Sequence, residues 1–198
     1  MSDAAGTRDY PIIVCDANAF YSIVTTDLIL SLGVAELFRP RWTNQIHDEW
    51  MRNLLANRPD LDPAKIERRR KQMDEAIDDC LVEGYEYLIP ELHLPDNDDR
   101  HVLAAAIRAQ AQVILTYNHR HFPPRVLAPY GMTAQHPDDF LAAVAERFSQ
   151  EVCDTLEEMR ARKTRPSLSQ AEILRKLENQ KLPKFVAALR ATGYGIAQ

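Results

Sequence analysis

No stretch of this sequence approaches the roughly 18 consecutive apolar residues that a membrane-spanning helix needs. The opening residues, MSDAAGTRDY, also lack the apolar centre of a secretory signal peptide. Cysteine is scarce: Cys15, Cys80 and Cys153 are an odd number, widely spaced, and no two of them form a CxxC pair. These absences are typical of a reducing compartment, so we expect a cytoplasmic protein in which Cys15 is a small buried hydrophobe.

An excess of basic residues is also missing. The net charge is −5, which argues mildly against a general nucleic-acid binder. Two features reduce the weight of that argument. Part of the negative charge can belong to a metal site, and the positive charge is clustered at 39–41, 68–71, 119–121 and 160–165. Most such clusters are only solvated faces, so they support nucleic-acid binding weakly.

Hydrophobic residues make up 45% of the chain, enough to bury one domain core. We expect a flexible N-terminus at 1–10, an α/β domain at 11–148, and a C-terminal helical extension at 149–198 that contains no strand. Short apolar or β-rich runs predict a parallel sheet. The expected strands are 12–14, 37–39, 85–90, 113–116 and an edge strand at 132–135.

Capping residues and apolar spacing predict the helices. One begins at Phe20 and ends at Gly33, and one runs from Thr43 or Asn44 to Ala56. A third begins at Asp62-Pro63 and ends at Gly84, with the arginine run at 68–71 exposed and free to meet a phosphate backbone. The remaining expected helices are 138–148, 151–162, one opened by the Ser169–Glu172 capping box, and one from Pro183 to about Gly193.

Three acids in four positions, Asp96, Asp98 and Asp99, precede an apolar helical run and then the strand at 113–116. An acid at this place is ordinarily a helix cap, worth about 1 kcal/mol. Only one side chain can be the cap, so three acids exceed that need. A hard cation such as Mg²⁺ would offset their mutual repulsion, and a metal site is the second interpretation.

Other polar residues stand where predicted strands end. Asp16 and Asn18 follow the first strand, and Thr116 and Asn118 follow the strand at 113–116. The carboxyl ends of parallel strands are where open sheets place their chemistry, although Asp16 can also be a helix cap. Glu49 borders the Ile46–Trp50 stripe of its helix and can point toward this edge, whereas Asp48 turns further away. His119 and His121 lack a third His or a Cys nearby, which disfavours a zinc site.

Four pieces of the sequence together resemble the PIN-domain nucleases, specifically the VapC-type toxins of bacterial toxin–antitoxin pairs. They are IIVCDANAF at 12–20, DEWMRNLL at 48–55, DNDDRHVLAAAI at 96–107 and VILTYNHRHF at 113–122. The resemblance covers residues 11 to about 145. It implies a PIN-like three-layer α/β/α fold with a central parallel sheet of four to five strands, and a Mg²⁺- or Mn²⁺-dependent endoribonuclease.

The resemblance also implies the site. Its acidic positions correspond here to Asp16, Glu49, Asp99, the extra acid Asp96 and, at the fourth position, Asn118. The first four would be metal ligands. Two departures are visible: the fourth position is often Asp but is Asn118, and the acid that often precedes the phenylalanine is His121. The residues that could hold waters or substrate are Asn18, Thr116, Arg120, Arg52 and Arg41.

Partners follow from the same resemblance. It implies an RNA substrate cut to 5′-phosphate and 3′-hydroxyl products. It also implies a homodimer and a small VapB-like antitoxin that covers the acidic groove, often by inserting an arginine. Phe185, Val186 and Leu189 of the last helix are either a partner contact or ordinary core.

Two other functions fit parts of the sequence. Asp16-Ala-Asn18 resembles the DxD motif of haloacid-dehalogenase-type phosphatases, but the second Asp is absent. The other alternative is a catalytically degenerate PIN domain that binds RNA or a protein without cutting. Asn118 and the acidic net charge favour this binding module.

Overall fold

The computed structural model describes residues 10–162 and 168–195. The predicted flexible N-terminus therefore lies outside the described residues except for Tyr10, as do positions 163–165 of the last basic cluster. The predicted boundary at residue 149 stays a prediction.

Four parallel strands form the central sheet: β1 (Ile12–Cys15), β2 (Arg39–Arg41), β3 (Val113–Leu115) and β4 (Thr133–Gln135). Their order is β2-β1-β3-β4, so β1 lies between β2 and β3. Val14 is aligned with Arg41 on one side and with Ile114 on the other. Apart from Ile12, which is partly buried, the residues of β1 and β3 are buried, as expected of parallel strands covered on both faces. The predicted α/β fold with a parallel sheet is confirmed.

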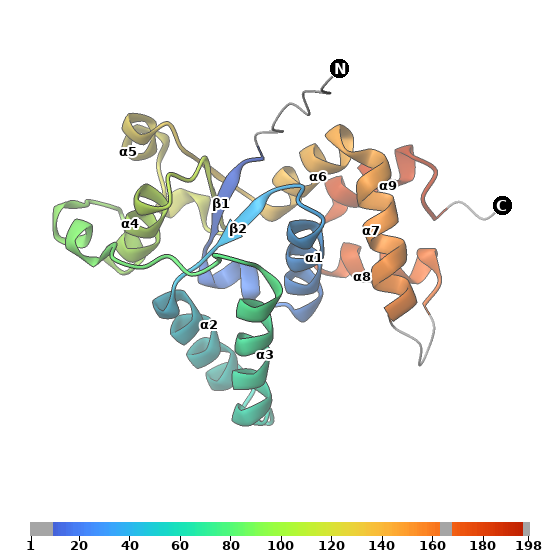
Figure 1. The fold of residues 1–198 in the computed structure, drawn as a ribbon, viewed down its shortest axis with the longest axis horizontal. Coiled ribbons are helices and arrows are strands. Elements are labelled where there is room, and N and C mark those ends of the chain that lie inside the picture. The colour runs from blue at the N-terminus through green and yellow to red at the C-terminus, as the bar shows by residue number, and fades with distance from the viewer. Residues whose placement is uncertain (1–9, 163–167, 196–198) are drawn as a thin grey trace, which may run out of the picture.

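Helices cover both faces of the sheet. Helix α4 (Arg100–Arg108) packs against β1 and β3, and α1 (Ile23–Val34) packs against β2 from the opposite side (Figure 1). Helix α6 (Pro137–Arg147) lies on the side of α1, where Phe140 meets Phe38 edge to face at 5.1 Å. The shorter elements are η1 (Ala17–Phe20), η2 (Glu86–Glu91), η3 (Asn97–Asp99), η4 (His119–His121), α5 (Pro124–Leu127) and η5 (Ala128–Tyr130).

Helices α2 (Asn44–Asn57) and α3 (Pro63–Ala76) pack against each other. Asp74 of α3 accepts hydrogen bonds from Trp42 Nε1 and His47 Nε2, both at 2.8 Å. His47 Nδ1 in turn accepts from Trp50 Nε1 at 2.9 Å, so the imidazole is the neutral Nε2–H tautomer. This buried network fixes the rotation of α2 about its own axis, and with it the direction of Glu49.

The arginine run at 68–71 is not the free surface that was predicted. Arg69 Nη2 donates to Phe20 O and to Thr26 Oγ1, both at 2.6 Å, and its guanidinium lies 4.8 Å from the centre of the Trp50 ring. Arg70 donates to Asn44 Oδ1 at 2.7 Å. Two of these four side chains therefore hold α3 to neighbouring elements.

The C-terminal helices are α7 (Ser149–Arg162), α8 (Gln170–Asn179) and α9 (Pro183–Ala191). Helix α9 packs on α6, and Asp138 caps it by accepting from the backbone N–H of Phe185 at 2.9 Å. Phe185, Val186 and Leu189 are fully buried, so they belong to the core and are not a partner surface. No helix in the described ranges is long and apolar enough to cross a membrane.

The expected strand at 85–90 is wrong, because Glu86–Glu91 forms the 3-10 helix η2. Leu88 N donates to Tyr85 O at 3.0 Å, and Pro90 has no N–H for a strand ladder. Beyond β2 the sheet gains, within residues 10–162 and 168–195, only an isolated bridge between Trp42 and Leu81. The second strand was also placed two residues early.

Two predicted helix ends differ from the structure. Gly33 lies inside α1, where a Cβ would come within 2.8 Å of Pro40 Cγ, so the glycine serves close helix–strand packing and not chain reversal. Helix α3 ends at Ala76 instead of Gly84. The chain turns at Asp79, whose φ is 55°, and Leu81 then pairs with Trp42. Ile77 and Leu81 are apolar and four residues apart, so in the sequence they looked like a continued helical face.

Candidate metal centre

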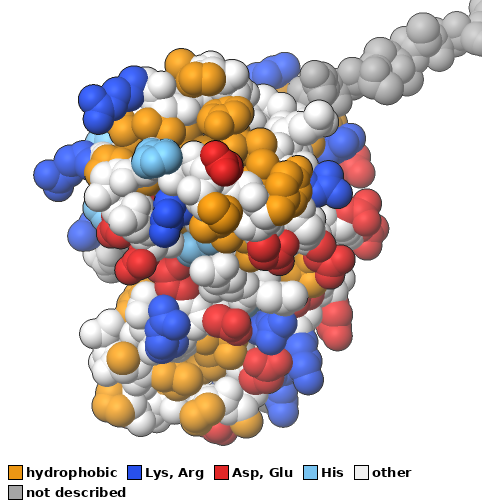
Figure 2. Space-filling model, turned by 90° about the vertical axis from the view of Figure 1, so that its left-hand side faces the viewer, with side chains coloured by type: hydrophobic (Ala, Val, Ile, Leu, Met, Phe, Trp, Pro, Cys, Tyr) orange, Lys and Arg blue, Asp and Glu red, His pale blue; other side chains and the backbone are white. Residues whose placement is uncertain are grey.

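The topology creates a crevice at the carboxyl ends of β1 and β3. The chain leaves β1 for α1 on one face, and α4 enters β3 on the other, so the helices diverge at this point. The groove there has a volume of about 690 Å³ and polar walls. In Figure 2 the molecule narrows between an upper and a lower lobe, and Asp and Glu side chains gather around that waist. The groove is lined by Asp16, Ala17, Asn18, Tyr21, Gln45, Asp48, Glu49, Arg52, Asn53, Asp96, Asp98, Asp99, His101, Asn118 and His121.

Asp16 sits directly after β1 and is 3% exposed. Its Oδ1 accepts from Ala17 N at 2.7 Å, and its Oδ2 accepts from Asn18 Nδ2 and Thr116 Oγ1, both at 2.6 Å. Both lone pairs of Oδ2 are therefore used, whereas Oδ1 keeps one lone pair. Asp16 caps η1, as one interpretation of the sequence expected, and still has an oxygen to offer a cation.

The acids of the groove destabilise one another's charge. Burial raises the pKa of Asp16 to about 6; the hydrogen bond from Thr116 opposes this rise, and the charges of Asp99 and Glu49 add to it. Burial also raises the pKa of Asp99, with the hydrogen bond from His121 opposing the rise. Since ionising these groups together is unfavourable, the groove favours a bound cation.

Thr116 is fully buried and does not line the groove. Its hydroxyl donates to Asp16 and accepts from Asn118 N at 2.9 Å. Asn18 completes the connection by donating to Asp16 and by accepting from Tyr117 N at 3.0 Å. Thr116 and Asn18 thus tie the end of β1 to the end of β3 and hold the Asp16 carboxylate in place.

The Thr116→Val variant is expected to raise the pKa of Asp16 further, by about one unit or more, because a hydrogen bond to a charged group is worth roughly 1.5–3 kcal/mol. The affinity for Mg²⁺ or Mn²⁺ at pH 6 should fall, since more of the carboxyl is then protonated. Carbon-13 NMR of the Asp16 carboxyl and calorimetry measure the two effects. Thr116→Ser keeps the hydroxyl and is the control. A pKa that is unchanged in Thr116→Val would contradict the role assigned to this hydroxyl.

Glu49 projects into the groove from α2, as its place beside the Ile46–Trp50 stripe predicted. Its Oε2 lies 3.3 Å from Nε2 of His101, a buried side chain on α4. Nδ1 of His101 has no hydrogen-bond partner among the described residues. His101 was not among the predicted site residues, although a histidine that follows the three acids on the apolar face of a helix was a visible signal. Asp48 is exposed at the rim.

Asp96, Asp99 and His121 form a second cluster in the same groove. The loop before α4 carries the two acids, and η4 carries the histidine. His121 Nδ1 lies 2.6 Å from Asp99 Oδ2 and 3.8 Å from Asp96 Oδ2. Asp96 also accepts from Asp98 N at 3.0 Å, so it is the cap that the sequence predicted for one of the three acids. Asp98 is exposed at the rim.

The remaining predicted substrate residues differ in position. Asn118 and Arg52 line the groove and are exposed. Arg120 is exposed in η4, outside the groove lining. Arg41 Nη1 donates to Asp78 O at 3.1 Å, and it does not line the groove either.

The donors of the groove fit a divalent cation. Carboxylate oxygens predominate, and they come from the end of β1, from α2 and from the segment of η3, while Asn118 and His121 come from the chain after β3. Within the described part of the chain, Asp96, Asp99 and His121 each offer a ligand atom, and these atoms all lie within 4.8 Å of one another. Hard ions such as Mg²⁺ take such oxygen ligands and keep several waters, for which this groove has room.

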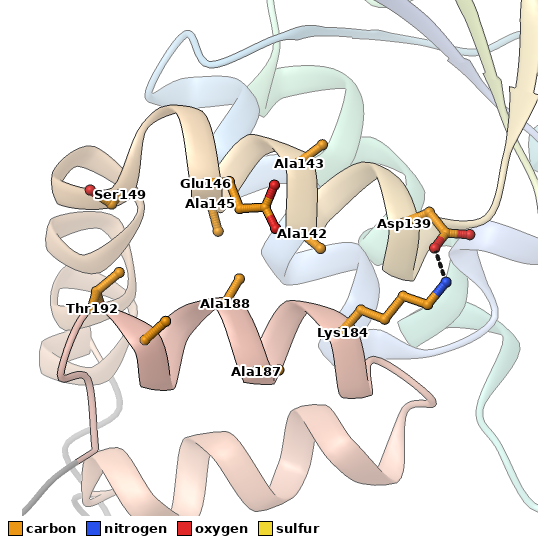
Figure 3. Close-up of a pocket in the computed structure, with 11 residues that line it drawn as sticks. Asp139, Ala142, Ala143, Ala145, Glu146, Ser149, Lys184, Ala187, Ala188 and Thr192 are labelled. Carbon is orange, nitrogen blue, oxygen red and sulfur yellow. Dashed lines mark hydrogen bonds and ion pairs between the residues drawn. The ribbon is translucent and has the colours of Figure 1, made fainter.

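A second groove, of about 710 Å³, lies between α6 and α9. Figure 3 shows that alanines line its floor and that Lys184 reaches across to Asp139 at one end. It has no comparable cluster of metal ligands among the residues that the structure describes. The chemistry therefore belongs to the acidic groove.

Comparison with known families agrees with this geometry. The sequence model of the PIN domain matches residues 12–120, which is more than half of the chain. The chain belongs to the PIN-domain family. The matched range includes Asp16, Glu49 and Asp99, and it ends one residue before His121. The three-layer fold and the resemblance are confirmed.

A second sequence model, the VapC50 C-terminal domain, matches residues 137–191, which run from α6 through α9. The chain is also 53% identical over 58 residues to "Putative ribonuclease VapC50" of Mycobacterium tuberculosis (strain ATCC 25618 / H37Rv). That alignment covers 29% of this chain and 34% of the relative. No solved structure matches the chain.

Proposed function

We propose that this PIN-domain protein is a metal-dependent endoribonuclease, the toxin of a VapC-type toxin–antitoxin pair. One observation carries the proposal: Asp16, Glu49 and Asp99, on three separate elements, line one groove at the carboxyl ends of β1 and β3. The partial match to a protein named as a ribonuclease supports RNA as the substrate.

The side chains of the groove would have separate roles in the reaction. Asp16, Glu49 and Asp99 would hold Mg²⁺ or Mn²⁺, with Asp96 as a further ligand. When bound, the ion lowers the pKa of a water and shields the charge that develops on the phosphate. Asp16 presents Oδ1 in a fixed direction because three donors immobilise its carboxylate. This preorganisation removes the need to reorient the carboxylate during the reaction.

Three further side chains would act on the RNA. Arg52, exposed on the α2 wall, is placed to bind a phosphate that flanks the cut. Asn118, which follows β3 and also lines the groove, offers an amide oxygen and N–H donors. Arg120, just outside the groove, would extend the positive charge along the bound RNA strand. Attack by water on phosphorus would leave a 5′-phosphate and a 3′-hydroxyl, as the family resemblance implies.

The groove also suggests how the enzyme is silenced. Its lining acids outnumber the single lining arginine, so a basic side chain from a partner would fit among them. We propose a small VapB-like antitoxin that places an arginine in this groove. A homodimer stays a prediction of the resemblance. None of the groove residues comes from the described parts of the helical extension, 149–162 and 168–195, so we propose that it supports the domain and not the reaction.

The catalytically degenerate PIN domain is the second candidate. Asn118 and His121 stand where the family often has acids, which lowers the charge available for an ion. Such a protein would bind RNA or a partner without cutting it. The match to the PIN-domain family argues against the phosphatase alternative.

The two candidates are separated by incubating the purified protein with RNA oligonucleotides and either Mg²⁺ or Mn²⁺. The enzyme should yield shorter products with 5′-phosphate ends, and EDTA should stop the reaction. RNA that is bound but stays intact with both ions would favour the binding module.

A further inference from the structure

His121 places a nitrogen donor where the groove otherwise offers oxygens. Its Nδ1 is 2.6 Å from Asp99 Oδ2 and 3.8 Å from Asp96 Oδ2, and the three ligand atoms lie within 4.8 Å of one another. The side chain is 37% exposed and lines the groove, so a cation in the groove can reach it.

The size of this cluster matches one metal ion. Ligands on opposite sides of a six-coordinate ion with bonds of about 2.1 Å are roughly 4.2 Å apart, and neighbouring ligands are closer. Three atoms that fit within 4.8 Å therefore need only small side-chain shifts to surround an ion. Asp96 and Asp99 both lie near the same imidazole nitrogen, Nδ1 of His121. An ordinary ion pair would need only one of these two acids.

A second imidazole, this one buried, lines the same groove. His101 is 4% exposed, its Nε2 faces Glu49, and its Nδ1 has no hydrogen-bond partner in the part of the chain that the structure describes. The groove is thus richer in imidazole than an all-carboxylate magnesium site.

We propose that His121 is a metal ligand and that, with Asp96 and Asp99, it makes this groove favour a divalent transition ion such as Mn²⁺ over Mg²⁺. Imidazole nitrogen suits first-row transition ions, whereas Mg²⁺ prefers oxygen ligands and gives up its waters reluctantly. The inference rests on the proposed function for its choice of groove and names the ion that the site takes.

Metal binding without RNA tests this proposal. Calorimetry at pH 7.5 should show a ratio of Mn²⁺ to Mg²⁺ affinity at least tenfold larger for the unaltered protein than for His121→Asp, which restores an oxygen ligand. Pulsed electron paramagnetic resonance of bound Mn²⁺ should show coupling to a ¹⁴N nucleus. That coupling should disappear in His121→Gln and persist in His101→Gln, which controls for the other imidazole.

Two outcomes would overturn the proposal: no ¹⁴N coupling in the unaltered protein, or an affinity ratio that is the same in His121→Asp. Circular dichroism of each variant checks that the fold is retained. Failure of the proposed function is a separate result, because a protein that coordinates Mn²⁺ through His121 but leaves RNA intact would keep this inference and lose that one. Conversely, if cleavage requires the acids but bound Mn²⁺ shows no nitrogen coordination, the proposed function would stand and this inference would fail.

Discussion

The Asp16→Asn variant is expected to cleave RNA about a thousand times more slowly than the unaltered protein, since losing a fixed metal-binding carboxylate removes several kcal/mol of transition-state stabilisation. The introduced amide would also turn an N–H group toward the amide of Asn18, which donates to Asp16 in the unaltered protein. Single-turnover cleavage of an RNA oligonucleotide measures the effect. Asp99→Asn, at a less buried position, should give a loss of similar size.

Asp79→Asn is the matched control for these variants. Asp79 is exposed, lies outside the groove and has a φ of 55°, a conformation that asparagine adopts readily. This variant removes one carboxylate and should keep the full rate. If Asp16→Asn and Asp99→Asn fold and retain most of the activity, the acidic groove is not the site of cleavage.

The metal-free protein is expected to gain stability from Asp16 as the pH falls from 7.5 to 5. Burial raises the folded-state pKa of Asp16 to about 6, above its value in an unfolded chain. The folded state therefore takes up a proton before the unfolded state does. The penalty present at pH 7.5, about 3 kcal/mol, begins to shrink as the pH falls through 6, is roughly halved at pH 5 and disappears only below the unfolded-state pKa of about 3.9. Burial lowers the pKa of His47 and works in the opposite direction, because stability is lost as that histidine protonates.

A bound cation should stabilise the ionised carboxylates at pH 7.5, as protonation of Asp16 stabilises the folded state at lower pH. With Mn²⁺ or Mg²⁺ at about 100 times its dissociation constant, the expected gain is about 2.7 kcal/mol, or roughly 5–10 °C in the unfolding midpoint. The gain should be larger at pH 7.5 than at pH 5, where protons compete for the carboxylates. Thermal unfolding at both pH values, with and without the ion, provides the measurement.

Asp16→Asn removes the ionisable group of Asp16 and leaves His47 unchanged. It therefore isolates the part of the pH dependence of stability that comes from Asp16. The difference in stability between the unaltered protein and this variant should change with pH near 6. A midpoint that does not respond to either ion at pH 7.5 would contradict metal binding in the groove.

Local patterns were enough to predict much of this fold. The short, β-branched apolar run at Ile12–Val14 favours a buried strand, and a carboxylate placed directly after such a strand lies at the carboxyl edge of the sheet. Asp16, Asn118 and the acids before α4 were therefore predicted to meet from their positions relative to strands and helices. The capping box at Ser169 is equally local, and it is present.

Other features depend on contacts between distant segments. Tyr85–Pro90 has the composition of a strand, but a strand needs a partner with free backbone groups, and beyond β2 the chain makes only one bridge within the described residues. Arg69 belongs to a charged run that looked solvated, and its exposure changed because Phe20 and Thr26 fold against it. Phe20 and Thr26 are both far from Arg69 in the sequence.

The sequence by itself determined which residue types stand at the ends of β1 and β3, because strand ends and caps are set by neighbouring residues. Only the tertiary structure decided how those residues divide their roles. Thr116 is turned inward to hold Asp16, His101 lies buried against Glu49, and His121 meets Asp99. Each of these directions depends on the packing of elements that are distant in the chain, and no local pattern encodes that packing.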